Sequence, residues 1–133
     1  MKAAVLKNWL DLELCDIPMP VPGKDEALIK VKLAGVCGSD IVVYRGKHMT
    51  ATVPTVLSHE ILGTIETLPE GYAGPFKVGQ RVYPYPLLVS GDPKRAGTMG
   101  AFSEYILAPD AKWNVGLYAV PDEIDDRSAA LIE

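Results

Sequence analysis

Glycines and prolines divide this chain into short segments, and this division constrains the fold more than any other feature. The 133 residues include 12 glycines and 11 prolines. Both residue types interrupt helices and strands, so their density favours many short strands joined by turns. Hydrophobic residues make up 48% of the chain, which is enough to form a core within one domain. A domain of this size buries roughly two-thirds of the surface of its unfolded chain.

Alternating and apolar runs locate the expected strands. Alternation with a period of two indicates a strand with one buried face. These runs predict strands over residues 2–6, 10–17, 27–34, 59–68, 78–85 and 102–107, and another within 113–120. We expect the strand over 10–17 to be half buried, and Ile29, Val31 and Leu33 to point into the core. About eight short strands in all predict a mainly β fold, a partly closed barrel.

Loops and two short helices complete the expected fold. The proline-interrupted residues 50–58 are expected to form a loop. Ser39 or Asp40 can cap a helix that runs through Tyr44, and Asp125 or Asp126 can cap a second helix over residues 127–133. The G-x-G-x-x-G pattern is missing, so the chain offers no site for the pyrophosphate of a dinucleotide.

Charge and cysteine content narrow the classes of partner. The formal net charge is −4, and the basic residues are scattered, which argues against binding nucleic acid or an anionic membrane surface. No run reaches the roughly 18 apolar residues that a membrane span needs. Asp11 and Glu13 interrupt the apolar start too early for a signal peptide. Cys15 and Cys37 lie in different contexts, so we expect no disulfide framework and a cytoplasmic location.

Three segments carry side chains suited to chemistry. Cys37 lies in the glycine-rich turn 35–40, His59 and Glu60 are adjacent, and Glu133 closes an apolar run. Thiolate, imidazole and carboxylate together form a reasonable zinc ligand set. Cys37 and His59 are 22 residues apart, a spacing more typical of an open catalytic site than of a zinc finger. A helix beginning just after Cys37 also favours its thiolate form.

The same residues have ordinary structural interpretations. A lone cysteine is most often a small buried residue, which suits Cys15 and could also suit Cys37. A histidine–glutamate pair is more often solvated than metal-bound, and Glu133 alone reads as a helix surface residue. His48 lies among small and polar residues and is expected to be solvated. Composition and spacing alone therefore favour these interpretations over a metal site.

Six motifs in order change that balance. They occupy residues 1–5, 31–40, 58–63, 76–82, 100–105 and 129–133. The third is similar to G-H-E-x-x-G, the fourth to F-x-V-G-D-R-V and the fifth to G-G-F-A-E-Y. Taken together the chain resembles the medium-chain dehydrogenase/reductase superfamily, and within it the zinc-dependent alcohol, sorbitol and galactitol-type dehydrogenases. The resemblance implies that residues 1–133 form a GroES-like catalytic domain, a partly open β-barrel with short helices.

The resemblance also implies a ligand set for one catalytic zinc. Cys37 and His59 fall on the family's ligand positions. The third ligand would be Glu60 or Glu133, with exchange between them in some members. Carboxylates at both positions resemble the polyol and sugar-alcohol branch.

Two neighbouring residues gain roles from the same resemblance. Ser39 falls where the family keeps a hydroxyl that takes the substrate's proton. Asp40 falls where a carboxylate accepts a hydrogen bond from the histidine ligand and so fixes its ring. The implied reaction is the interconversion of an alcohol or polyol with its carbonyl compound, with NAD or NADP.

The chain departs from the family pattern at several places. Ser58 replaces the usual glycine before the histidine, which we expect to be a tolerable backbone change. Val42 replaces a histidine that often continues the proton relay. Residues 84–99 contain no cysteine, so no structural zinc is expected. The sequence ends at Glu133, and we expect the Rossmann-type nucleotide-binding domain to be absent from this chain.

Other functions fit parts of the pattern. One is a zinc-free quinone or enoyl reductase of the same superfamily, and another is a GroES-like binding module without catalysis. Those reductases generally lack the cysteine and the histidine–glutamate pair, and a bare barrel needs neither Cys37 nor Glu133. A small-molecule alcohol or polyol is the expected substrate, and the full-length enzyme is expected to be a homo-oligomer.

Overall fold

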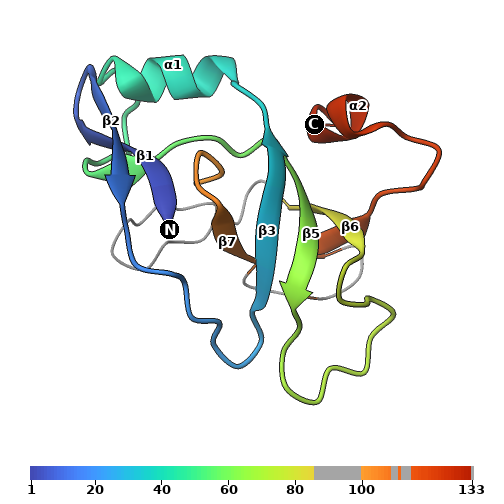
Figure 1. Cartoon of the computed structure of the whole chain (residues 1–133). Helices are drawn as coiled ribbons and strands as arrows, with labels where there is room; N and C mark the ends of the chain where they lie inside the picture. Colours follow the sequence, from blue (N-terminus) through green and yellow to red (C-terminus); the bar gives the residue numbers. More distant parts are fainter. Residues whose placement is uncertain (86–99, 109–110, 112–114, 133) are drawn as a thin grey trace.

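Two open antiparallel sheets and two short helices make up the described part of the chain, which is residues 1–85, 100–108, 111 and 115–132 of a computed structural model (Figure 1). The strands are β1 (Lys2–Asn8), β2 (Asp11–Asp16), β3 (Ala27–Ala34), β4 (Thr55–Val56), β5 (Ile61–Thr67), β6 (Arg81–Pro84), β7 (Tyr105–Ala108) and β8 (Leu117–Ala119). The helices are α1 (Gly38–Tyr44) and α2 (Asp126–Ala130). Neither helix is long and apolar enough to cross a membrane.

The sheets meet at one edge, which gives the partly open barrel that the sequence predicted. The strand order is β2-β1-β4 in the smaller sheet and β7-β3-β5-β6-β8 in the larger one. The Ala4 N–H donates to the Phe102 carbonyl at 2.7 Å, just before β7. The Lys2 N–H donates to the Glu104 carboxylate at 2.7 Å. Glu104, from the G-A-F-S-E-Y motif, therefore joins β1 to the larger sheet.

The core lies on the larger sheet. Its inward side chains include Ile29, Ile61, Ile65, Val82 and Ile106, all essentially inaccessible to solvent. Alternation along the strands puts these residues on one face, and Ile29 was predicted to point inward.

Two burial predictions were wrong. Leu33 is 38% exposed, because the β3–β5 register shifts between Val31 and Leu33 and interrupts the alternation. Val31 itself is partly buried and packs on the core. The strand β2 is mostly exposed rather than half buried, since it lies at a sheet edge, with Leu14 75% exposed.

Each helix begins after an N-cap residue, and some caps and bounds differ from those predicted from the sequence. Cys37, not Ser39 or Asp40, is the N-cap residue of α1. Asp125 caps α2 by accepting hydrogen bonds from the Arg127 and Ser128 N–H groups, as one of the two alternatives predicted. The helix α2 ends at Ala130 instead of continuing to 133. Residues 50–58, which were expected to form a loop, contain the short strand β4, which pairs with β1.

Candidate functional site

The two central motif segments meet where β3 and β5 pair. Ala34 at the end of β3 is opposite Ile61 at the start of β5. One residue further on, the Gly35 N–H donates to the Glu60 carbonyl at 2.8 Å. The turn that leads to Cys37 and the segment that holds Glu60 therefore run side by side, although they are far apart in the sequence.

The Asp40 carboxylate ties these segments together from inside the molecule. The residue is only 5% exposed. Its Oδ2 accepts the Cys37 N–H at 2.9 Å, and its Oδ1 accepts the Ser58 N–H at 2.9 Å. One carboxylate thus holds the backbone at one candidate ligand and the backbone next to another. The predicted hydrogen bond between Asp40 and the His59 ring stays a prediction.

Ser58 adds a third link between the segments. Its hydroxyl donates to the Gly35 carbonyl at 2.9 Å, and the residue is buried. Its backbone has φ 76°, a left-handed conformation that residues other than glycine seldom adopt. This conformation gives a physical reason for a glycine at position 58. A tolerable backbone change was expected here, whereas the contact of the hydroxyl was not predicted, although the serine itself was the available signal.

Glu60 folds its side chain over the glycine of the facing turn. A Cβ atom placed on Gly35 would lie 2.0 Å from the Glu60 Oε2 and 2.8 Å from its Cβ. Any larger residue at position 35 must therefore displace Glu60. The glycine in this turn brings the carboxylate against the backbone that leads to Cys37.

The structure brings the predicted ligand segments together without closing a complete ligand cluster. Cys37, Ser39, His59 and Glu60 are all half-buried. Within the described ranges, no three histidine, cysteine, aspartate or glutamate side chains form a group that could hold a metal ion. Glu133, the remaining predicted ligand, lies outside the described residues.

The helix α2 packs close to this region. Its Ala129 and Ala130 are buried against Leu62, two residues after Glu60. Figure 1 shows α2 near the end of β3 from which α1 begins.

Arg81 fixes the segment that leads into α2. Its guanidinium donates to the carbonyls of Pro121 at 2.7 Å and Ile124 at 2.9 Å, and to the Asp126 carboxylate at 2.8 Å. Lys32 on β3 also pairs with Asp126, at 2.5 Å. Hydrogen bonds from Lys32 and then Arg81 hold the pKa of Asp126 below its ordinary value. These contacts join α2 to both β3 and β6.

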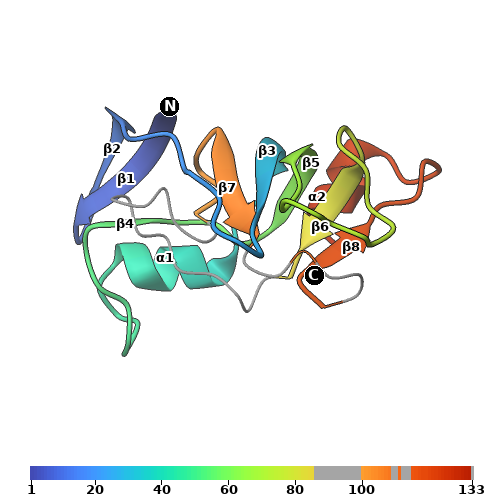
Figure 2. The same cartoon turned by 90° about the horizontal axis from the view of Figure 1, so that it is seen from below.

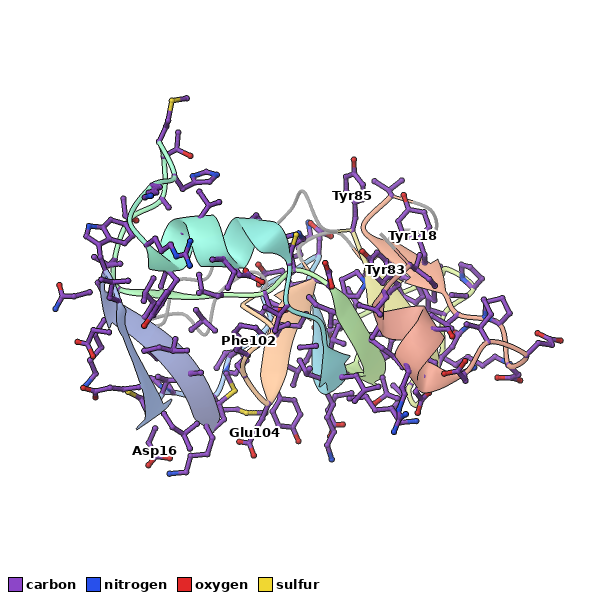
Figure 3. All side chains as sticks on the ribbon, turned by 90° about the horizontal axis from the view of Figure 1, so that it is seen from above. Asp16, Tyr83, Tyr85, Phe102, Glu104 and Tyr118 are labelled. Atoms are coloured by element: carbon purple, nitrogen blue, oxygen red, sulfur yellow. The ribbon has the colours of Figure 1, made fainter. Side chains whose placement is uncertain are left out.

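An open apolar groove of about 870 Å³ lies between the two sheets and α1. Leu12 and Leu14 line it from β2, and Val36 and Ile41 line it from the α1 region. Phe102, which Figure 3 shows between the smaller sheet and β7, also faces the groove. The groove reaches Asp40, so the residue whose carboxylate links the two ligand segments forms part of its wall. Figure 2 shows α1 lying beside the smaller sheet.

Two open antiparallel sheets joined at one edge, with a cysteine turn held against a histidine–glutamate turn, define a GroES-like domain of the dehydrogenase type. The family model for the alcohol dehydrogenase GroES-like domain matches residues 23–122, and the chain belongs to this family.

Several proteins that are similar to this chain are dehydrogenases. The sorbitol dehydrogenase of Halalkalibacterium halodurans is 40% identical, over 87% of this chain and 37% of that protein. A crystal structure of an Escherichia coli CFT073 alcohol dehydrogenase with NADH has a TM-score of 0.79 at 30% identity, over 100% of this chain and 42% of that one. The 2R,3R-butanediol dehydrogenase of Bacillus subtilis gives 0.77 at 30% identity, over 99% and 44%. The chain spans about two-fifths of the length of these relatives.

Proposed function

We propose that this chain is the catalytic domain of a zinc-dependent dehydrogenase that interconverts an alcohol or polyol and its carbonyl compound with NAD or NADP. The observation that carries the proposal is the Asp40 carboxylate, which links the backbone of Cys37 to that of Ser58, the residue before His59. A buried carboxylate that joins these two segments supports a shared role for them. The polyol preference rests on carboxylates at both 60 and 133, and on the similarity to a sorbitol dehydrogenase.

The donor set suits zinc. Cys37, His59 and Glu60 offer sulfur, nitrogen and oxygen ligands, and Glu133 offers a second carboxylate. The turn that holds Cys37 and the segment that holds His59 and Glu60 are already linked through their backbones, which supports a common site. When bound, zinc would supply Lewis acidity that lowers the pKa of a substrate hydroxyl. We propose one such ion per chain and no structural zinc, since residues 84–99 contain no cysteine.

The chain's own residues would orient the substrate and move its proton. Ser39 lies in the first turn of α1, two residues after Cys37, and is half-buried. This placement supports its proposed role, in which the hydroxyl accepts the proton that the substrate loses. Asp40 would act through the backbone, and through its predicted bond to His59, by holding the ligands in position.

A second domain would complete the enzyme. We propose that residues 1–133 are the GroES-like catalytic domain and that a Rossmann-type domain outside this chain binds the nucleotide. The similar chain solved with NADH is more than twice as long, which supports this division. We further propose a homo-oligomeric enzyme in the cytoplasm, a location that suits the two free cysteines.

Turnover by the full-length protein tests the proposal. The assay offers a panel of simple alcohols and polyols with NAD⁺ and NADP⁺, and compares the wild type with Ser39→Ala. Loss of a positioned proton acceptor should lower kcat by about 10²–10⁴-fold. Thr67→Ala, at the far exposed end of β5, is the control and should retain wild-type turnover.

Two outcomes would contradict the proposal. One is a zinc-loaded protein that oxidises no member of the panel with either nucleotide. The other is NADPH-dependent reduction of a quinone or enone by metal-free protein, which would identify a zinc-free reductase.

A further inference from the structure

The strained backbone at Ser58 calls for a compensating interaction. A left-handed φ of 76° places the Cβ of an L-residue close to the following carbonyl oxygen, and glycine avoids this contact. The residue is 2% exposed, so water cannot satisfy its polar groups. The hydrogen bonds that Ser58 makes with its neighbours must therefore offset the backbone strain that a glycine would avoid.

All three polar groups of Ser58 are bonded within the protein. Its N–H donates to Asp40, its hydroxyl donates to the Gly35 carbonyl, and its carbonyl accepts the Ala101 N–H at 3.1 Å. Glycine could form the first and third bonds, because both involve the backbone. Only the hydroxyl bond to Gly35 depends on the side chain.

The hydroxyl bond lies directly between the two candidate ligand segments. Gly35 is two residues before Cys37, and Ser58 is the residue immediately before His59. The bond therefore limits how far the Cys37 turn and the His59 segment can move apart. A glycine here would leave that restraint to the Asp40 carboxylate and the Gly35–Glu60 backbone bond.

We propose that Ser58 is a positioning residue for the metal site, whose hydroxyl fixes the spacing of Cys37 and His59 at the expense of backbone strain. The inference rests on the zinc site proposed above. Ser58 then has two distinct effects: its left-handed backbone governs stability, and its hydroxyl governs metal affinity.

Two substitutions separate these effects in the full-length protein. Ser58→Gly removes the hydroxyl and relieves the backbone strain, while Ser58→Ala removes the hydroxyl and keeps the strain. Co²⁺ serves as the probe, with affinity measured by competition with a chelator and the thiolate-to-cobalt absorption band reporting on Cys37. Both variants should bind Co²⁺ about threefold to tenfold more weakly than the wild type. Ser58→Gly should nevertheless unfold at a higher temperature than Ser58→Ala.

Ser103→Ala is the matched control. Its hydroxyl also donates to backbone carbonyls, those of Gly100 at 2.7 Å and Tyr105 at 2.9 Å, but it ties none of the candidate ligand segments. The control should lower the unfolding temperature without changing Co²⁺ affinity or the absorption band.

The outcomes distinguish this inference from the proposed function. If Co²⁺ binding by the wild type shows no band that Cys37→Ser abolishes, the zinc site itself is wrong. If the band is present but Ser58→Gly binds Co²⁺ as tightly as the wild type, the site stands and the positioning role of Ser58 is overturned. Because glycine fits the left-handed backbone, this variant tests the inference even if Ser58→Ala fails to fold.

Discussion

Replacing Asp40 with alanine removes one acceptor that serves two backbone donors. The Ser58 N–H is buried, and leaving such a group without a partner costs about 1–3 kcal/mol. The Cys37 N–H is only partly buried at the start of α1, so water can replace part of its bond, and the loss is about 1 kcal/mol. We therefore expect Asp40→Ala to lower the free energy of unfolding by about 2–4 kcal/mol, a large part of the total for a domain of this size.

Asp40→Asn gives a graded version of the same test. The amide keeps one acceptor oxygen but turns its NH₂ group toward the other backbone N–H, so about half of the alanine effect should remain. The asparagine variant should also weaken metal affinity by about 10–100-fold in the full-length protein, because Asp40 supports the ligands.

Urea denaturation of the 133-residue chain measures the stability effect. Asp16→Ala is the control: its carboxylate is exposed and pairs only with Lys2 in the contacts that the described residues show, so the urea midpoint should stay at the wild-type value. An Asp40→Ala variant as stable as this control would refute the claim that the carboxylate holds the two segments together.

Four further results are expected. Gly35→Ala should destabilise the fold by about 1–3 kcal/mol and weaken Co²⁺ binding, because its new Cβ collides with Glu60; urea titration and metal competition measure both. Arg81→Met should speed hydrogen exchange in α2. In the wild type the protection of the α2 amides, taken relative to the intrinsic exchange rate at each pH, should fall only below the ordinary pKa range of an aspartate, since the pKa of Asp126 is lowered and its pairing is lost on protonation. The 133-residue chain alone should show no calorimetric binding of NAD⁺ or NADP⁺, because it lacks a glycine-rich phosphate turn; micromolar binding would contradict this.

Most strands could be predicted from periodicity, because burial of one sheet face makes hydrophobic residues alternate with a period of two. The strand β3 was predicted over the same residues that it occupies. The register shift near Leu33 was not predictable, since it depends on pairing with β5. The strand β4 was missed because it has two residues, Thr55 and Val56, and exists only through pairing with β1.

The candidate site residues could be named from the sequence, whereas the geometry that brings their segments together could not. Residue types and spacing left Cys37 and His59 with ordinary interpretations, and the resemblance gave them a common role. That their segments lie side by side follows from the β3–β5 pairing, which no local pattern specifies. The two backbone bonds of Asp40 and the left-handed backbone of Ser58 depend on tertiary contacts, so no local sequence pattern signals them.

Zinc analysis of the purified full-length protein and three variants tests the central claim most directly. The variants are Cys37→Ser, His59→Ala and Cys15→Ser, the last being the control because Cys15 lies on the exposed edge strand β2. We predict one zinc per chain in the wild type and in Cys15→Ser, and none tightly bound in the other two. Wild-type zinc content in Cys37→Ser, or two zincs per chain in the wild type, would contradict the account.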